Sequence, residues 1–580
     1  MNAGEHSLKL QLPHVLLFLL LAMPSTADIS QHTVIVKDIS PGIVFQQFKT
    51  NNGSSPLLYD VLHINLHTPG IGVICVQSRG KIEDSSPDTG RETVRAIARR
   101  YNAIAGVNAN FFPFTGQPLS LTIHNGVLVT SPTPLRPSLG IGPEGAVMDS
   151  IVMHASAAVT GVNTIPISGL NYAPDANEIV LLTPDFDESP VRNYPLTVVT
   201  INSVNLPLRP SKKMHGIVAS IQILKPGTSM PLCQSGEMML VGSGNASNVL
   251  SSLAVGNTIT LECDLYAQNH QINSEPIWKH MKEAVSAGPW LLTNGQIVNN
   301  MEDEGFSKRW FVDFHHPRTA IGITGNGNLI MIVVDGRSAL SGGISLSDLA
   351  KIMQQMGVVD AMNLDGGGSS TMVVQNEIVN LPSDGYSRPV SNALLVTAPP
   401  QKSSSGSLEI NAPLATLTAG DSEQLSVTGS SISKRGILWG SKYGNGYVDQ
   451  RGYLTCYQAG KVIILARCKG QTASTTVNVT AGPPANLSVA LTPPLVSNSN
   501  IRATLKDAFG NPIKGESISF SVVGGSVYPS TVTTDINGNA RTEVTWNNPL
   551  VSNASVTVTV NNTASVTVSP SVLKGTWTKP

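Results

Sequence analysis

Two aspartates follow apolar runs in a pattern that suits acid–base or nucleophilic chemistry. Asp335 comes directly after the apolar run 329–334, and Asp365 ends a second run, 358–365, which is followed by three glycines and Ser369. A pair of carboxylates can supply a general base, a general acid or a nucleophile at a glycosidic bond. The simpler alternative is that each Asp-Gly pair makes a turn. Two such pairs, one of them leading into glycines and hydroxyls, favour a catalytic site.

Arginine, amide and aromatic side chains in the same region suit a phosphate joined to a sugar. Arginine binds phosphate oxygens through two N–H groups, glycine-rich turns add backbone donors, and amides with aromatic rings suit sugars. No Lys follows the glycines, so the pattern of a nucleotide phosphate loop is absent. The predicted catalytic residues are Asp335, Asp365, Arg318 and Arg388. The predicted substrate-binding residues are Asn108, Asn110, Phe112, Gly336, Arg337, Asn363, Gly366, Gly367 and Ser369.

The sequence requires no metal ion or other cofactor. The cysteines fit no zinc spacing. In an oxidising compartment Cys233 could pair with Cys263 and Cys456 with Cys468, which leaves Cys75 odd, and buried free thiols are the alternative. Carboxylates, amides and carbonyls also bind divalent cations, so the question of whether the predicted site binds one stays open.

Three predicted elements position the two aspartates. The unbroken run 329–334 is typical of a strand buried on both faces, and 358–365 predicts a second strand. Between them, Ser345 begins a capping-box-like sequence whose apolar residues recur at helical spacing until Gly357. A strand–helix–strand unit makes its strands parallel, so we expect both aspartates at the same sheet edge, where open sheets hold ligands.

A further strand is predicted on the N-terminal side of this unit. Arg318 leads the run 320–324, which turns through Gly-Asn-Gly-Asn into 329–334 and is therefore antiparallel to it. This arrangement places Arg318 beside Asp335. We predict an α+β catalytic domain with a mixed sheet, spanning 28–397.

Composition and the N-terminal sequence indicate an exported protein. Lys+Arg number 37 and Asp+Glu 38 in 580 residues, with no basic run, which argues against a nucleic-acid partner. An apolar stretch at 15–23, preceded by Lys9 and followed by small residues, predicts a signal peptide over 1–27. No later run is long enough to span a membrane. The predicted localisation is secreted or cell-surface.

The C-terminal third changes to short alternating strands. A Pro/Ser-rich linker, 398–407, is followed by two predicted all-β Ig-like sandwiches over 408–481 and 482–567, and by a tail over 568–580. The first sandwich is similar to bacterial Ig-like domains of group 2. The second resembles the invasin-type group 1. Both resemblances imply a bacterial surface or secreted protein with possible association with the cell wall.

Six ordered segments resemble the phosphodiester glycosidase family. They are NANFF at 108–112, AGPWLLTNG at 287–295, PRTAIGI at 317–323, VVDGRS at 333–338, SGGISLSDLA at 341–350 and NLDGGGSSTM at 363–372. The resemblance spans 90–397 and implies hydrolysis of a sugar-1-phosphodiester. By motif match it carries over as site residues Asn108, Arg318, Asp335, Gly336, Asn363, Asp365, Gly366 and Arg388.

Two functions therefore follow from the sequence. The first is a secreted bacterial glycosidase that hydrolyses glycosyl phosphodiesters in a phosphorylated polysaccharide or cell-envelope glycopolymer. Asp365 is then the general base or nucleophile, Asp335 its partner or an orienter of Arg318, and Arg318 with Arg388 holds the phosphate. The alternative is a cell-surface carbohydrate-binding or adhesion protein, which the Ig-like modules favour and the paired carboxylates disfavour.

Overall fold

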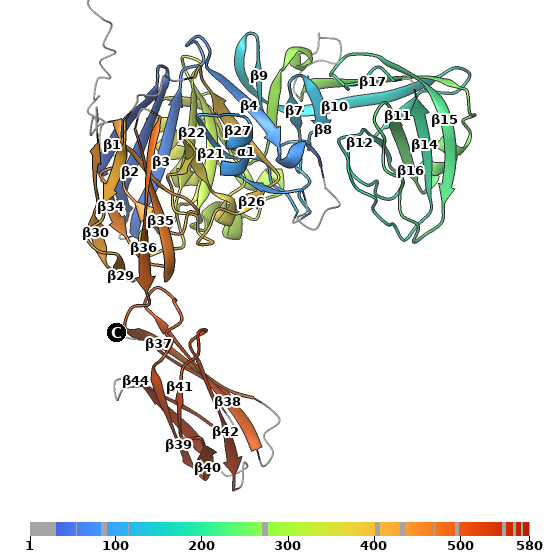
Figure 1. Ribbon diagram of the computed structural model, residues 1–580. Coiled ribbons are helices and arrows are strands. Elements are labelled where there is room, and N and C mark those ends of the chain that lie inside the picture. The colour runs from blue at the N-terminus through green and yellow to red at the C-terminus, as the bar shows by residue number, and fades with distance from the viewer. Residues whose placement is uncertain are drawn as a thin grey trace, which may run out of the picture.

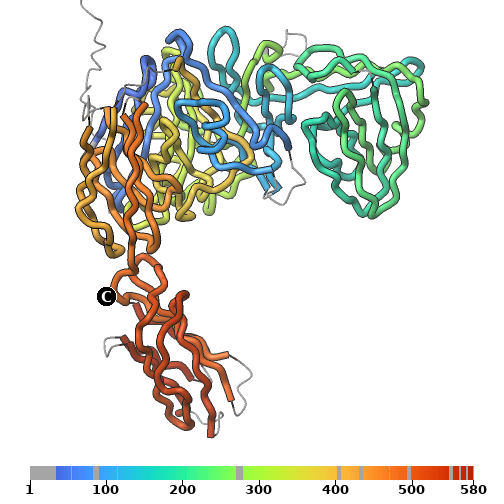
Figure 2. The backbone as a smooth tube through the Cα atoms, viewed as in Figure 1, coloured from blue at the N-terminus to red at the C-terminus, as the bar shows by residue number. Residues whose placement is uncertain are grey.

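The computed structural model describes most of the chain beyond the predicted signal peptide, which lies outside the described residues. The described ranges are 31–53, 55–82, 90–113, 115–202, 204–268, 277–400, 406–429, 436–468, 470–492, 498–547, 553–560, 564–569 and 572–578. Figure 1 shows a central block, a lobe that projects from its side, and a C-terminal module that extends away from it. The tube in Figure 2 gives the same division by colour.

An eight-stranded sheet carries the residues predicted to be functional, and every neighbouring pair in it is antiparallel. The predicted parallel strands share their direction, but the strand led by Arg318 lies between them. For this sheet the mixed pattern was a wrong prediction, because the helical crossover passes over one strand position; the parallel pair within 28–397 lies in another sheet, between residues 169–170 and 180–181. In spatial order the strands are β1 (Gln31–Ser40), β2 (Ile43–Asn52), β3 (Ser55–Ile64), β22 (Leu329–Val334), β21 (Arg318–Thr324), β23 (Val358–Asn363), β19 (Trp290–Thr293) and β20 (Gln296–Ile297).

A second sheet packs on one face of the first. Its strands from the catalytic region are β25 (Glu377–Ile378), β24 (Met372–Val374), β6 (Ala105–Asn108), β27 (Asn392–Thr397) and β4 (Gly72–Gln77). Alternate residues of β22, such as Met331 and Val333, join Val107 and Leu394 in the core between the sheets. A two-stranded pair, β5 (Glu92–Thr93) and β26 (Pro389–Val390), lies beside this layer.

One helix covers the outer face of each sheet. α3 (Leu346–Gln355) packs its apolar side on Ile330 and Ile332 of β22, and α1 (Val94–Arg100) packs on the second sheet. The Ser345 side chain caps α3 by accepting from Asp348 N–H, and Gly357 follows the helix with φ 79°, which confirms both predicted ends. Among the described residues the only other α-helix is α2 (Asn245–Ser251). The region is mainly β, so the predicted α+β fold class overstated its helix content.

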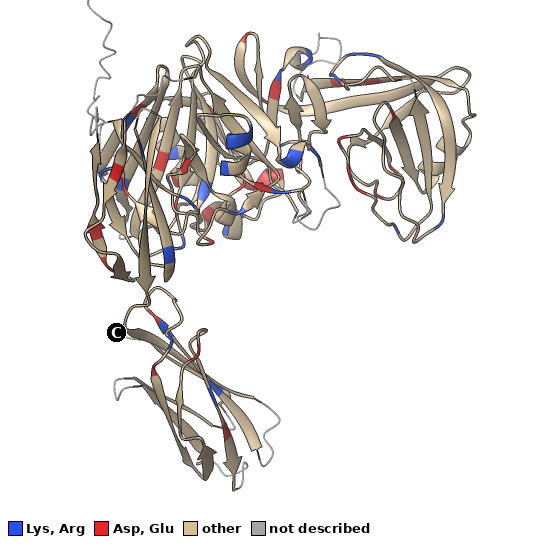
Figure 3. Ribbon diagram, in the orientation of Figure 1, with Lys and Arg blue, Asp and Glu red and all other residues tan. Residues whose placement is uncertain are grey.

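The projecting lobe is an insertion between β6 and β19. Its twelve-stranded sheet surrounds an apolar core that includes Trp278 and Ile151. Charged residues of both signs occur on this lobe as they do on the central block (Figure 3). Its strands are β7 (Thr122–His124), β8 (Val127–Thr130), β9 (Pro137–Gly142), β10 (Gly145–Val159), β11 (Ile165–Ile167), β12 (Gly169–Leu170), β13 (Ile179–Leu182), β14 (Leu196–Asn202), β15 (Met214–Leu224), β16 (Met238–Ser243), β17 (Thr258–Ala267) and β18 (Glu283–Ser286).

The first C-terminal module continues the second sheet of the central block. Its strand β32 (Leu438–Ser441) pairs with β25, so that nine strands form one sheet. Trp439 and Ile464 belong to the module's own apolar core. The remaining strands are β28 (Leu408–Asn411), β29 (Thr416–Thr418), β30 (Ser422–Gln424), β31 (Ser426–Gly429), β33 (Tyr447–Val448), β34 (Tyr453–Thr455), β35 (Gly460–Cys468) and β36 (Gln471–Thr480).

The second C-terminal module is a sandwich of a five-stranded and a four-stranded sheet. Its last strand, β45 (Lys574–Thr578), pairs with β37, so residues predicted as a tail complete the first of these sheets. The predicted boundary at 567 was therefore too early. The other strands are β37 (Pro484–Thr492), β38 (Asn498–Asp507), β39 (Ser517–Val523), β40 (Gly525–Tyr528), β41 (Thr531–Thr533), β42 (Asn539–Trp546), β43 (Ser555–Val560) and β44 (Ala564–Val568).

The five cysteines are all buried free thiols, so neither of the two pairings considered from the sequence is present. Burial raises the pKa of the Cys233 and Cys263 thiols to about 12. None of the helices in the described part of the chain is both long and apolar enough to cross a bilayer.

Candidate active site

Asp365 lies just beyond the end of β23 and is partly exposed. Its carboxylate accepts from the Gly366 N–H at 2.9 Å, and its backbone N–H donates to Ala109 O at 2.9 Å. Burial of the carboxyl group raises its pKa to about 6, against the lowering effects of the Ser369 hydroxyl, the Gly366 N–H and the Arg388 charge. Asp365 is therefore a rigidly held carboxyl group that titrates near neutral pH, as a general base or nucleophile requires.

Arg388 approaches the same loop from the other side. Its Nε donates to the Asp384 carboxylate at 2.7 Å, and Nη1 lies 3.5 Å from the Ser369 hydroxyl. A Cβ atom at Gly368 would collide with the side-chain ends of both Arg388 and Asp384, so a larger residue there would displace this ion pair. The glycine-rich segment thus exposes backbone to a guanidinium. Asp384 was not predicted, because one acidic residue in a polar loop carries no signal.

Arg337 and His316 border the loop at Gly367. Arg337 has φ 58°, and a Cβ at Gly367 would lie 3.2 Å from its guanidinium. Its Nη2 is 3.2 Å from His316 Nδ1, while His316 Nε2 is 3.0 Å from Trp310 O. These two partners assign the imidazole proton to Nε2. Burial lowers the pKa of His316, and the nearby arginines lower it further, so the ring is neutral at pH 7.

Exposed aromatic rings extend from His316 along the surface. Trp310 is 61% exposed and Phe314 is 50% exposed. Their ring centroids are 5.7 Å apart, and Phe314 lies 5.2 Å from the His316 ring. Trp310 belongs to a π-helix, η4 (Lys308–Asp313), and the Arg309 guanidinium lies 5.0 Å from its ring. We call Trp310, Phe314 and His316 the aromatic platform. Such planes suit the apolar faces of sugar rings.

Arg318 is in a different environment from the other arginines. It is 2% exposed, and its guanidinium donates to the carbonyl oxygens of Ile344, Phe311 and Phe314 while it lies 5.1 Å from the Phe311 ring. Burial, with a smaller contribution from Arg337, lowers its pKa to about 9. Its contacts tie the segment that carries the aromatic platform to β21. Arg318 is therefore a positioning residue in this arrangement, and its contacts do not support the predicted role of holding the phosphate.

Asp335 shares the sheet edge of Asp365, but it has different neighbours. It is 1% exposed, and its carboxylate accepts from Asn380 Nδ2 at 3.0 Å and from Leu381 N–H at 3.0 Å. The pKa of Asp335 is raised by burial, and the pKa of the neighbouring Asp60 is raised by burial and by the charge of Asp335. The carboxylate of Asp335 is thus enclosed, and the prediction that it acts on substrate beside Asp365 lacks support from its contacts. In the part of the chain that the structure describes, Asp335 makes no ion pair with Arg318, so its contacts do not support the predicted role as an orienter of Arg318.

The predicted sugar-binding amides are buried. Asn108 donates to Asp365 O and accepts from the Thr319 hydroxyl and Thr371 N–H. Asn363 donates to the carbonyl oxygens of Gly288 and Leu364. These amides hold the ends of β6 and β23 together, so they support Asp365 and do not face a ligand.

The other two predicted contacts with the sugar also have partners within the protein. Asn110 exchanges hydrogen bonds with Asn392. Phe112 packs with the apolar cluster under α1, whereas its neighbour Phe111 contacts Phe306 and Phe311 at the base of the aromatic platform.

Two predicted glycines permit close packing of backbone. A Cβ at Gly336 would lie 2.8 Å from Gly343 Cα and 2.9 Å from Pro317 N, and a Cβ at Gly366 would lie 2.9 Å from Pro317 O. The loops that follow β22 and β23 therefore pack on the segment before β21. This packing brings the residues from 316 to 318 and from 365 to 369 together.

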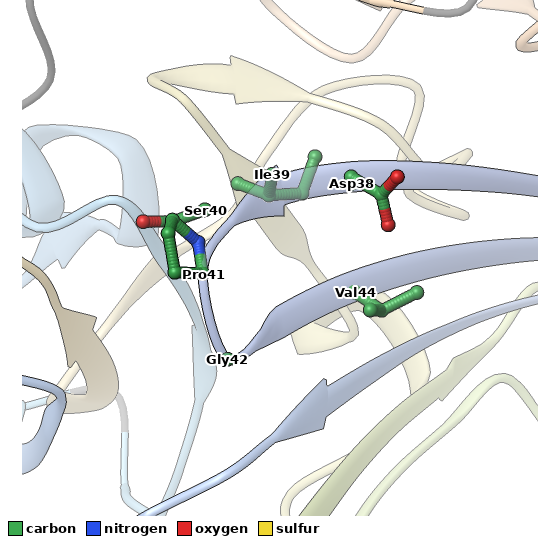
Figure 4. Close-up of a pocket in the computed structure, with 6 residues that line it drawn as sticks. All are labelled: Asp38, Ile39, Ser40, Pro41, Gly42 and Val44. Carbon is green, nitrogen blue, oxygen red and sulfur yellow. The ribbon is translucent and has the colours of Figure 1, made fainter. Parts of the chain in front are cut away.

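The hollow in Figure 4 is elsewhere, at the turn between β1 and β2. It is lined by Asp38, Ile39, Ser40, Pro41, Gly42 and Val44, among which Asp38 is the only ionisable side chain. It offers no partner for acid–base chemistry. In the described ranges, no three His, Cys, Asp or Glu side chains are grouped so that they could hold a metal ion.

The fold and the polar cluster first define a class of protein. It is a two-sheet β protein with one helix on each outer face, in which a carboxylate, arginines and exposed aromatic rings meet at one sheet edge. Residues 226–397 match the phosphodiester glycosidase family, and residues 496–572 match the bacterial Ig-like domain (group 1). The chain thus carries a phosphodiester glycosidase domain followed by a group 1 Ig-like domain. The first match includes Asp365 and Arg388 but not Asn108.

Relatives of known sequence match the chain over short segments. An uncharacterized protein derived from the SPbeta prophage of Bacillus subtilis (strain 168) is 40% identical over 95 residues, which are 16% of this chain and 15% of the relative. The N-acetylglucosamine-1-phosphodiester alpha-N-acetylglucosaminidase of Mus musculus is 37% identical over 112 residues, or 18% of this chain and 21% of the relative. The match thus spans about a fifth or less of each relative. A crystal structure of a hypothetical protein from Synechocystis has a TM-score of 0.53 at 25% identity, covering 63% of this chain and 64% of the other.

Proposed function

We propose that the chain is a hydrolase that cleaves the bond between a sugar and a phosphodiester. The observation that carries this proposal is the loop after β23, where the Asp365 carboxyl group and the Arg388 guanidinium both contact Ser369. A carboxylate next to an arginine suits a substrate with an electrophilic sugar carbon and an anionic phosphate. The family match over residues 226–397 and the activity for which the mouse relative is named support the same chemistry.

Asp365 acts on the sugar carbon in this proposal. It either takes a proton from the water that attacks the anomeric carbon, or attacks that carbon itself to form a glycosyl ester, which water then hydrolyses to release the sugar and restore the carboxylate. The bond between that carbon and the phosphate oxygen breaks, and its electron pair stays on the phosphate. The released phosphomonoester is a weak base, so a strong general acid is not needed. Arg388, with Arg337 on the other side of the glycine loop, stabilises the charge that develops on the phosphate.

The direct test measures whether the full-length protein hydrolyses a phosphodiester in which phosphate joins an alcohol to the anomeric carbon of N-acetylglucosamine. This is the sugar named for the mouse relative. The proposal expects free sugar and the phosphomonoester of the alcohol as the two products. Panels with other sugars identify the preferred substrate. Tight binding of these panels without turnover would instead favour the alternative function, a carbohydrate-binding or adhesion protein, which the group 1 Ig-like domain makes the second candidate.

The pH dependence of the reaction distinguishes a base or nucleophile from an acid. The pKa of Asp365 is about 6, and the reaction needs its ionised form. We therefore expect kcat/KM to rise about tenfold per pH unit below pH 6 and to level off above it. The measurement is a pH profile of kcat/KM under subsaturating substrate. Activity that falls as pH rises through 6 would mean that Asp365 works as a protonated acid.

The aromatic platform supports a substrate larger than one sugar. Trp310 in η4 is linked to the glycine loop through Phe314, His316 and Arg337, so it can stack on a further sugar ring of a phosphorylated polysaccharide. Trp310→Ala is expected to raise KM for a polymeric substrate about tenfold and to leave kcat nearly unchanged. A single glycosyl phosphodiester should show a smaller effect.

The matched control for this variant is Tyr528→Ala, which removes another exposed ring, 86% exposed, from the C-terminal module. Steady-state kinetics on polymeric and single-unit substrates of both variants make the comparison. Equal KM values for Trp310→Ala and the unmodified chain on the polymer would show that the aromatic platform takes no part in substrate binding.

The wider context of the protein is also part of the proposal. We infer a bacterial protein exported through a signal peptide over 1–27, with a phosphodiester glycosidase domain over 28–397 and a group 2-like module over 408–481. Low charge content and the Ig-like match support a secreted or cell-surface location and contact with an envelope glycopolymer. Mass spectrometry of the exported protein tests the cleavage site.

A further inference from the structure

The first C-terminal module, whose strands lie within 408–480, is joined to the central block by backbone and by charge. Ile378 of β25 pairs with Ser441 of β32, which makes one continuous sheet. Glu377, which is 1% exposed, pairs with Arg467 of the module at 3.2 Å and with Arg95 of α1 at 3.5 Å. A buried carboxylate held by cations from both sides is costly to separate. The module is therefore docked, unlike a spacer on a flexible linker.

A second group of contacts reaches the segment 381–388, which carries Asp384 and Arg388. Ser387 N–H donates to Tyr443 O at 3.0 Å. A Cβ at Gly444 would lie 2.9 Å from the Pro382 ring, and a Cβ at Gly385 would lie 2.6 Å from the Gln458 amide. The segment is thus packed against two loops of the module, 442–447 and 457–458.

The first residue of this segment is held in the same way. Leu381 packs with Leu58 and with Tyr447 of the module in one apolar cluster. The Leu381 N–H in turn donates to the enclosed carboxylate of Asp335. Asp335, the segment 381–388 and the module therefore form one connected structure behind the glycine loop.

Arg388 depends on this structure for its place. Its own polar contacts are with Asp384, in the same segment, and with Ser369 at 3.5 Å. Of these two hydrogen bonds only the second reaches the loop of Asp365, against which the guanidinium also packs closely at Gly368. The position of the guanidinium relative to Asp365 therefore depends in part on how the segment packs on the module.

We propose that the 408–480 module is a working part of the active site, whose loop 442–447 positions Arg388 against the phosphate of the substrate. This inference rests on the proposed function for the chemistry that Arg388 performs. It assigns the module a role in catalysis, in which Gly444 and Gln458 are positioning residues that touch no substrate. Displacing the segment by a fraction of a bond length should misplace the guanidinium and slow the reaction.

The test uses Gly444→Ala in the full chain. Gly444 has φ 77°, and the added methyl group would meet Pro382, so the segment must move. We expect kcat/KM to fall about 10- to 100-fold. The control is Gly460→Ala in the same module: its φ is 132° and a Cβ there would meet nothing within 4 Å. This variant carries backbone strain without the contact and should keep its activity.

Three further measurements separate positioning from general damage. Thermal unfolding should show similar midpoints for the two glycine variants. Hydrogen exchange of the Ser387 amide should be faster in Gly444→Ala than in Gly460→Ala, because its bond to Tyr443 O is loosened. In an Arg388→Met background, Gly444→Ala should have almost no additional effect on kcat/KM. Gln458→Ala gives a milder variant with the same expected pattern.

The outcomes distinguish failure of the proposed function from failure of the positioning role. Absence of turnover by the unmodified chain contradicts the proposed function, while the hydrogen-exchange result still reports whether the module holds the segment. Turnover that is unchanged in both Gly444→Ala and Gln458→Ala overturns the positioning role. An equal loss in Gly444→Ala with and without Arg388 also overturns it, since the module would then act through something other than this side chain.

Discussion

Replacing Asp365 by asparagine is expected to lower kcat about a thousandfold on a glycosyl phosphodiester. Asparagine has nearly the same shape and keeps an oxygen that can accept from the Gly366 N–H, so the loop should retain its structure. It cannot take a proton from water, and it is a poor nucleophile. The loss should therefore appear in kcat, with a much smaller change in KM.

Asp360→Asn is the matched control for this prediction. Asp360 lies in the same strand, β23, and its carboxylate accepts from the Asn294 N–H at 2.9 Å. Its replacement changes the same functional group in a comparable hydrogen bond, and activity should persist. If the Asp365→Asn variant folds and hydrolyses the substrate as fast as Asp360→Asn, Asp365 takes no part in the chemistry.

Replacing Arg388 by methionine is expected to lower kcat/KM about 100-fold. The methionine fills much of the same volume but provides no charge for the phosphate. The variant should also move the rising limb of the pH profile to higher pH, because the Arg388 charge lowers the pKa of Asp365 in the unmodified chain. Steady-state kinetics across pH measures both effects. Arg388→Lys should recover part of the rate, since it restores the charge without the planar fork.

The control for Arg388→Met is a variant of another ion pair of similar exposure, between Arg100 of α1 and Glu92. Arg100 pairs with Glu92 at side-chain exposures of 35% and 20%, against 26% and 20% for Arg388 with Asp384. Arg100→Met should affect stability to a similar small degree and leave the pH profile in place. Arg388 is contradicted as a phosphate ligand if both variants show the same kinetics.

Local patterns in the sequence predicted the elements around the site well. The serine cap and the terminal glycine of α3 depend on residues next to the helix, and both ends are where the sequence indicated. The common direction of β22 and β23 likewise follows from a short crossover. The prediction therefore placed the two aspartates at the correct edge of the sheet.

The direction in which each side chain points at that edge could not be predicted. Val334 faces α3, so Asp335 turns toward the second sheet, where Asn380 and Leu381 enclose it. Those partners lie some distance along the chain, and no local pattern links them to Asp335. The same limitation explains Arg318, whose guanidinium is occupied by carbonyl oxygens from two loops.

Some residues at the site were overlooked although the sequence held a signal. The segment 309–316 contains Trp310, Phe314 and His316 close to the predicted Arg318, and aromatic residues in a polar loop commonly bind sugars. The docking of the 408–480 module had no such signal. It depends on a bridge between Ile378 and Ser441 and on contacts with glycines, which become visible only in three dimensions.

The most direct test of the central claim follows the oxygen of water during hydrolysis of a glycosyl phosphodiester by the full chain. If Asp365 directs attack at the sugar carbon, water enriched in the heavy oxygen isotope places its label in the anomeric hydroxyl of the released sugar and none in the phosphate. Label in the phosphomonoester would show attack at phosphorus and would contradict the account. So would the absence of any hydrolysis by the unmodified chain.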